Sequence, residues 1–228
     1  MFIGLVTAAT EPILGDLRPL ARIREEGRTE VPPLNQLLEE LKRTESRGER
    51  QLQYLLWHRG YLVSPRERII AREVPCSLGG IRRASVADFL VIDDSRRVPV
   101  IVEVKCGTAS DSLTGALLEL LVQWCFHKSA MSPFRRQLRD DGVQIEDAVF
   151  QPEAVLVAPA SFYRQNLRRS STSKRNNEAV QAARLLRILN DTFALSVGFI
   201  VVSDNWFNQG TGFRCRQFRL NTTGCVAR

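Results

Sequence analysis

The chain has 228 residues, of which 44% are hydrophobic and 25% are charged. This length and balance indicate one or two folded domains with a sizeable core, and they exclude a wholly disordered, collagen-like or low-complexity chain. The formal net charge is +7. An excess of cations is typical of proteins whose partners are polyanions such as nucleic acid.

The five cysteines are spread along the chain without a CxxC pair, which indicates free thiols in a reducing compartment rather than a zinc site. The short apolar start has no basic region before it, and Glu11 and Asp16 follow, so no signal peptide is expected. No run approaches the roughly 18 apolar residues that cross a bilayer. We therefore expect a cytoplasmic protein that does not bind a membrane.

The first part of the chain is predicted to be an arm followed by helices. Residues 1–33 are charged toward their end and finish in two prolines, which predicts an arm or linker. Residues 34–228 are then expected to form a single domain. Leucines recur at helical spacing on both sides of Gly48, so this glycine either separates two helices or bends one.

The rest of the domain alternates extended and helical patterns, which predicts one α/β domain with a mixed sheet. Turn residues separate the second and third extended segments. The sequence predicts strands at 67–78, 84–93 and 98–105, an amphipathic helix at 113–124, a buried strand at 154–158, a helix at about 176–190, and strands at about 194–203 and 213–221.

The third predicted strand, VPVIVEVKCG, carries two charges in an apolar run. Because side chains alternate along a strand, Glu103 and Lys105 point to the same face. Burying such a pair costs free energy unless it is paired or functional. If the preceding turn is centred between Ser95 and Arg96, Asp88 lies directly opposite Glu103 on the neighbouring strand.

Two adjacent carboxylates repel each other unless a cation lies between them. Hard oxygen ligands of this kind suit Mg²⁺ or Mn²⁺. Lys105, beside them, would activate the attacking water or stabilise charge on a phosphate. The alternative is an edge strand with a solvated ion pair formed by Glu103 and Lys105, and with Asp88 on an exposed face.

The pattern D-x₁₄-E-x-K on two consecutive strands, with helices and strands in this order around it, resembles the PD-(D/E)xK nuclease superfamily. The resemblance covers about residues 35–160 and implies a restriction-endonuclease-like αβββαβ core with a mixed central sheet. It implies a metal-dependent nuclease, with DNA favoured over RNA as substrate. Asp88 and Glu103 would bind Mg²⁺ or Mn²⁺, and Lys105 would position or activate water.

Two further residues follow from the same resemblance. The family often adds a metal-binding glutamate from the first helix, for which Glu49 is the best match and Glu45 a rival. Some members carry a QxxxY motif on the helix after ExK, where Gln123 matches and His127 replaces the tyrosine. Ala87 also stands where the family name has proline.

The line formed by Glu119, Gln123 and His127 borders the apolar stripe of the helix at 113–124. Its spacing is typical of the solvated edge of an amphipathic helix. The alternative, which applies to Gln123, is that this edge faces the strand carrying Glu103.

A basic segment at 161–175 is a candidate contact for the nucleic-acid backbone. Phe162 and Tyr163 within it could stack on an unpaired base, whereas the alternative is a flexible polar loop without a partner. Its cations are Arg164, Arg168, Arg169, Lys174 and Arg175.

A second functional hypothesis is a non-catalytic nucleic-acid-binding or protein-interaction module on a nuclease-like fold, because fold alone does not fix function. Many nucleases of the resembling family act in pairs, so a homodimer or a partner subunit is also consistent with the resemblance.

Overall fold

A computed structural model describes most of the chain from residue 31 onward. Of the predicted arm at 1–33, only residues 31–33 are among the described residues. Side chains at 75–78, 81–85, 133 and 173–177 are likewise outside the description. The described ranges are 31–43, 48–78, 81–107, 112–129, 131–147, 151–167 and 173–218.

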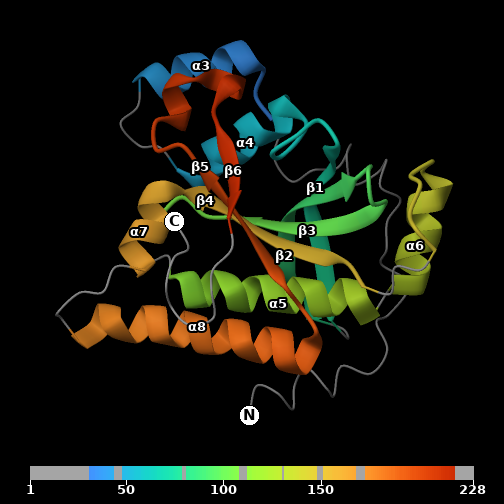
Figure 1. Ribbon diagram of the computed structural model, residues 1–228. Coiled ribbons are helices and arrows are strands. Elements are labelled where there is room, and N and C mark those ends of the chain that lie inside the picture. Colours follow the sequence, from blue (N-terminus) through green and yellow to red (C-terminus); the bar gives the residue numbers. More distant parts are fainter. Residues whose placement is uncertain are drawn as a thin grey trace.

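The described strands form one six-stranded sheet in which spatial order follows chain order (Figure 1). The first three strands pair antiparallel, the third, fourth and fifth are parallel, and the sixth is antiparallel. The predicted mixed sheet is thus confirmed. The strands are β1 (Glu67–Leu78), β2 (Ile81–Asp93), β3 (Val98–Val104), β4 (Glu153–Pro159), β5 (Val197–Val202) and β6 (Cys215–Phe218).

Six α-helices accompany the sheet within the described residues, so the predicted α/β class is confirmed. Two short 3₁₀ turns, Trp206–Asn208 and Gly210–Gly212, precede β6. None of the described helices is both long and apolar enough to span a bilayer. The helices are α3 (Leu34–Arg43), α4 (Glu49–Arg59), α5 (Leu113–Ser129), α6 (Met131–Asp140), α7 (Ala160–Leu167) and α8 (Ser173–Phe193).

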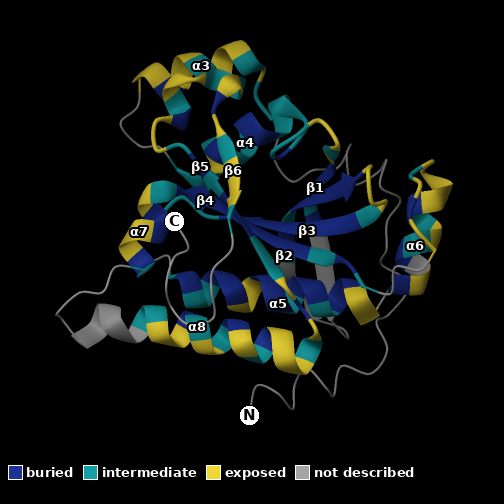
Figure 2. Cartoon of the chain, in the orientation of Figure 1, coloured by how far each residue is buried: buried dark blue, intermediate teal, exposed yellow. Residues whose placement is uncertain are grey.

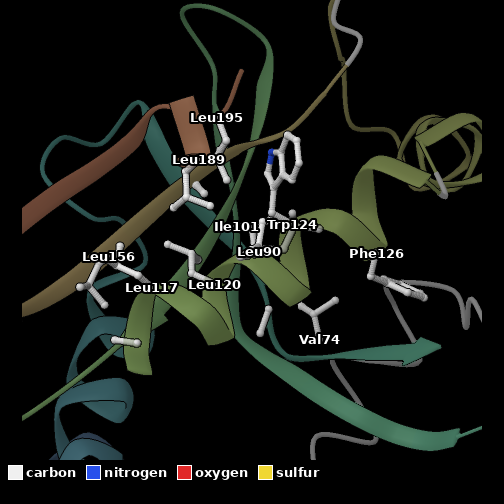
Figure 3. Packing of buried hydrophobic residues seen from close by; sticks show 14 of the residues in the cluster. Val74, Leu90, Ile101, Leu117, Leu120, Trp124, Phe126, Leu156, Leu189 and Leu195 are labelled. Atoms are coloured by element: carbon white, nitrogen blue, oxygen red, sulfur yellow. The ribbon is translucent and has the colours of Figure 1, made fainter. Parts of the chain in front are cut away.

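The two faces of the sheet pack against different helices, and each carries its own hydrophobic cluster. On one face, α5 lies against the sheet with α8 beside it (Figure 1). Trp124 of α5 is fully buried there among leucines of α5 and the sheet (Figure 3). On the other face, α3 and α4 bury Leu37, Leu52 and Leu55 against valines of β2–β4. Figure 2 shows the resulting buried central strands.

Gly48 separates two helices rather than bending one, which resolves the alternative left open by the sequence. Its backbone N–H donates to the side-chain oxygen of Gln51 at 3.0 Å, and α4 starts at the next residue. Gly60 ends α4 with φ of 79°, a left-handed conformation that glycine adopts without steric cost. Glu49 is therefore the first residue of α4.

The register of the β2–β3 hairpin, which the sequence predicted from its turn, is confirmed. Phe89 pairs with Val102, and Asp93 pairs with Val98 at the turn. The buried, valine-rich β3 lies between β2 and β4 in the sheet, as expected for a strand covered on both faces. The hairpin thus brings β2 and the end of β3 together at the candidate site.

Candidate functional site

The candidate site begins where β2 and β3 stop pairing. The ladder between them ends at Phe89 and Val102, and the next step of this register places Asp88 opposite Glu103. There, Asp88 Oδ2 accepts a hydrogen bond from the backbone N–H of Val104 at 2.7 Å. The Asp88 side chain therefore supplies an acceptor where the pairing of the strands stops, and its carboxylate is fixed at the end of β3.

Glu103 is buried at this end of β3, with its side chain 6% exposed. Glu103 Oε1 accepts from Lys105 Nζ at 2.7 Å, and Glu103 Oε2 accepts from Gln123 Nε2 at 2.7 Å. Gln123, on α5, also donates to the Val86 carbonyl at 3.2 Å. Gln123 therefore faces β3, the strand that carries Glu103. This is the second of the two possibilities that the sequence left open for Gln123.

The N-terminus of α4 reaches the same site. Glu49 Oε2 lies 3.8 Å from Lys105 Nζ. One turn later, Gln53 Nε2 donates to Asp88 Oδ1 at 2.8 Å and to Glu49 Oε1 at 3.4 Å. The structure therefore brings all five predicted catalytic residues into one network, which includes Asp88, Glu103, Lys105, Glu49 and Gln123. Glu45, the rival of Glu49, lies outside the described residues.

Two members of the network were missed from the sequence as site residues. Gln53 follows Glu49 at the i, i+4 spacing that places side chains on one helix face, and this spacing was the available signal. Glu119 Oε2 lies 2.8 Å from Lys105 Nζ, although Glu119 was interpreted as part of a solvated helix edge. That interpretation is wrong for Gln123 and His127, which are both buried.

Burial, reinforced at Asp88 by the neighbouring carboxylates, raises the pKa values of the two acids of the site. Burial, the charge of Glu103 and that of Glu49 raise the pKa of Asp88 well above its usual value. Burial also raises the pKa of Glu103, to about 7, although Lys105 and Gln123 partly oppose this shift. Such shifts indicate carboxylates held close together at a free-energy cost, which is frequent at functional sites.

Lys105 is the cation within this group of acids. Burial lowers the pKa of its ammonium, but Glu103, Glu119 and Glu49 outweigh burial, so the pKa is raised above the usual value. Lys105 is therefore charged at neutral pH. Its position between carboxylates makes it a hydrogen-bond donor to oxygen atoms at the site rather than a free base.

Across the described ranges, no group of three or more histidine, cysteine, aspartate or glutamate side chains is arranged to hold a metal ion. The predicted ligand set of Asp88, Glu103 and Glu49 is therefore not preformed as a three-carboxylate cage. Mg²⁺, however, usually takes only one or two carboxylates, together with waters and substrate phosphates. The hard carboxylate oxygens of Asp88 and Glu103 fit that requirement.

His127 has a structural environment. It is fully enclosed on α5, its Nδ1 lies 2.8 Å from the Gln123 carbonyl oxygen, and its ring packs edge-on against Phe126 and Phe134. Burial lowers the pKa of His127 to about 4. The ring is therefore neutral at pH 7 and helps to place the α5 backbone next to Gln123.

The proposed base-stacking role of Phe162 and Tyr163 is wrong. Both side chains are buried in the core, and the Tyr163 hydroxyl donates to the Leu156 carbonyl at 2.9 Å. They belong to α7, which turns their apolar face inward. Arg164 points outward and forms an ion pair with Asp204. The side chains of Arg168, Arg169, Lys174 and Arg175 lie outside the described residues, so their contact with nucleic acid remains a prediction.

The chain was compared with protein-family models, with curated proteins and with solved structures. No family model, curated protein or solved structure matches it.

Proposed function

We propose that this protein is a metal-dependent nuclease of the PD-(D/E)xK type, which hydrolyses phosphodiester bonds in nucleic acid. The observation that carries the proposal is the network in which Asp88 of β2 meets Glu103 of β3 and Lys105, which directly follows β3. Glu49 and Gln123 join it from the helices on either side. Acids that repel one another beside a partly buried lysine suit a site for a divalent cation and a phosphate.

The order of elements supports the same proposal. A helix, three antiparallel strands, a helix and a fourth strand parallel to the third follow one another as α4, β1, β2, β3, α5 and β4, with α6 inserted before β4. This order agrees with a restriction-endonuclease-like αβββαβ core. In this order Asp88 and Glu103 belong to adjacent strands, Lys105 follows the second of them, and Glu49 and Gln123 come from the flanking helices.

The donor chemistry fits Mg²⁺ or Mn²⁺. Each oxygen of Asp88 and Glu103 accepts one hydrogen bond from protein, and a carboxylate oxygen can accept more than one interaction. Asp88 and Glu103 would hold the ion, with waters and a substrate phosphate completing its shell. When bound, the ion would offset the negative charge that develops on the phosphate in the transition state.

The residues of the chain have separable roles in this proposal. Gln123 fixes Glu103, and Gln53 with the Val104 backbone fixes Asp88, so both carboxylates are oriented before substrate arrives. The raised pKa of Lys105 favours an ammonium that donates to the attacking water or to a phosphate oxygen. Positioning and charge stabilisation are thus favoured over proton abstraction by Lys105.

DNA is the favoured substrate on the family resemblance, and a net charge of +7 suits a polyanion. A cytoplasmic location and pairing of two copies to cut two strands also remain predictions.

A cleavage panel tests the proposal. Plasmid DNA, single-stranded DNA and RNA would each be incubated with the protein and Mg²⁺, Mn²⁺ or EDTA, beside the Glu103→Gln variant. Cutting that requires the metal and is lost in the variant is the expected result. Cutting that persists in EDTA or in the variant would contradict the proposal and indicate a contaminating nuclease.

One observation favours the second candidate, a non-catalytic module. Lys105 Nζ is within 2.8 Å of both Glu103 and Glu119, so the protein's own cation already balances part of the site. A charge cluster of this kind can be structural. Salt-sensitive binding of nucleic acid, without cleavage under any metal condition of the panel, would favour this module over the nuclease.

A further inference from the structure

Lys105, which directly follows β3, is held from two sides, by Glu103 of β3 and by Glu119 of α5. Its Nζ lies 2.7 Å from Glu103 Oε1 and 2.8 Å from Glu119 Oε2, whereas Glu49 Oε2 is farther away at 3.8 Å. The Lys105 side chain is 12% exposed and that of Glu119 is 53% exposed. Glu119 therefore reaches from the solvent edge of α5 to a nearly buried ammonium.

The contact is part of a closed network between β3 and α5. Glu119 and Gln123 are one helical turn apart, so they project from the same face of α5. Glu119 binds Lys105, Lys105 binds Glu103, and Glu103 binds Gln123. The helix backbone joins the two ends, and buried neighbours such as Leu120 fix the helix against the sheet. Each of the four side chains thus limits the freedom of the next.

We infer that Glu119 is a positioning residue for Lys105, an inference that rests on the proposed nuclease function. If Glu103 binds a metal ion, its negative charge is shared with that ion and it holds Lys105 less firmly. Glu119 is then the nearest remaining anion, and it keeps the ammonium directed at the site. In this inference Glu119, which also lies within hydrogen-bond reach of Glu103, acts through Lys105 and neither binds the metal nor contacts nucleic acid.

The electrostatics argue against a role for Glu119 in binding substrate. A half-exposed carboxylate at the site repels a phosphate backbone. If Glu119 were only a surface charge, its neutralisation would leave kcat unchanged and lower KM. If it positions Lys105, neutralisation lowers kcat, because the donor is no longer held where charge develops.

The test compares Glu119→Gln with Glu146→Gln, a matched change at an exposed acid outside the network. Steady-state cleavage of a labelled DNA duplex with Mn²⁺ should give a kcat about 10- to 100-fold lower for Glu119→Gln, as is typical when a residue that orients a site is lost. KM should not rise. Calorimetric titration with Mn²⁺ alone should give similar affinities for both variants and the unmodified protein, because in this inference Glu119 acts on Lys105 and not on the metal.

A double-mutant cycle isolates the path through Lys105. In the Lys105→Met background, addition of Glu119→Gln should change the residual cleavage by less than about twofold, because the residue it acts on is gone. An unchanged kcat in Glu119→Gln, a loss of Mn²⁺ affinity, or full additivity in the cycle would each overturn the inference while leaving the nuclease proposal intact. If the unmodified protein cleaves no nucleic acid, the proposed function fails and the inference fails with it.

Discussion

Two aspartates on β2, five positions apart, lie in opposite electrostatic environments. At the turn end, Asp93 Oδ1 accepts from the backbone N–H groups of Ser95 and Arg96, at 2.9 and 3.2 Å, and Asp93 Oδ2 accepts from Arg96 Nε at 2.6 Å. At the site end, Asp88 accepts from two uncharged donors and faces the charges of Glu103 and Glu49.

The pKa values of the two aspartates move in opposite directions. Burial opposes ionisation of both, but hydrogen bonds from Ser95 and Arg96 lower the pKa of Asp93 overall. The pKa of Asp88 is raised because burial and the charges of Glu103 and Glu49 outweigh the Val104 hydrogen bond and the charge of Lys105. The same residue type therefore stabilises the hairpin at one end of the strand. At the other end it stores unfavourable free energy that a bound cation would release.

Among the residues around the two proposed metal ligands, the largest expected effect comes from removal of Lys105, the only cation in the described site network. Lys105→Met should lower cleavage by about 10²- to 10³-fold, because a preorganised donor to developing negative charge is lost. Rates would be measured under single-turnover conditions with Mn²⁺. Lys128→Met, at an exposed lysine on the same helix as Gln123, is the control and should cut at the normal rate. Equal rates for both variants would remove Lys105 from the mechanism.

The next effect concerns the free-energy cost of burying the Glu103 carboxylate. The pKa of Glu103 is about 7 in the folded protein and about 4.5 for an ordinary glutamate. As pH rises, Glu103 therefore loses its proton in the unfolded chain before it does so in the folded protein. The free energy of unfolding falls as pH rises from about 4.5 to about 7. Glu103→Gln should raise the free energy of unfolding by about 3 kcal/mol at pH 8 in EDTA and change it little at pH 4. Urea denaturation at both pH values checks this. A destabilised variant at pH 8 would show that Glu103 contributes net stability.

The turn end should respond in the opposite direction. Asp93→Asn weakens charge-assisted hydrogen bonds to Arg96 and Ser95 and should lower the free energy of unfolding by about 1–2 kcal/mol at pH 7. Because the pKa of Asp93 is lowered, its contribution is present above the usual aspartate pKa and is lost as pH falls through the folded-state value. The difference from the unmodified protein should therefore shrink in acid, as thermal melts between pH 3 and pH 7 can measure.

The smallest expected effect comes from Gln53, which holds Asp88 from α4. Gln53→Leu should lower cleavage by about tenfold, as is typical for the loss of a residue that orients a ligand. Calorimetry should also show that Gln53→Leu binds Mn²⁺ more weakly than the unmodified protein does. Gln165→Leu, at an exposed glutamine of α7, should do neither. Normal Mn²⁺ affinity in Gln53→Leu would mean that the Val104 backbone alone is sufficient to fix Asp88.

Much of the hairpin could be predicted from sequence because its determinants are local. The turn residues after Asp93 set the register, and strand alternation then places Asp88, Glu103 and Lys105 on one face. The boundary at Gly48 was left open, because a glycine can either end or bend a helix. The hydrogen bond from its N–H to Gln51, seen only in the folded chain, resolves it.

The remaining contacts depend on how helices pack on the sheet. Glu119 has the spacing of a solvated edge, and only the placement of α5 against β3 brings it to Lys105. Phe162 and Tyr163 were misassigned because neighbouring arginines suggested an exposed segment. Helix α7 instead separates the two kinds of side chain by face, with the aromatic rings inward and Arg164 outward.

The most direct test of the account measures metal-dependent cleavage by Asp88→Asn and Asp93→Asn side by side. The two variants carry the same chemical change on the same strand, and both keep an oxygen that can accept hydrogen bonds. With Mn²⁺ and well below the melting temperature, Asp88→Asn should lose cleavage by about 10³-fold, whereas Asp93→Asn should cut at the normal rate. Cleavage that survives in Asp88→Asn, or falls equally in both, would contradict a catalytic metal site at this end of β2.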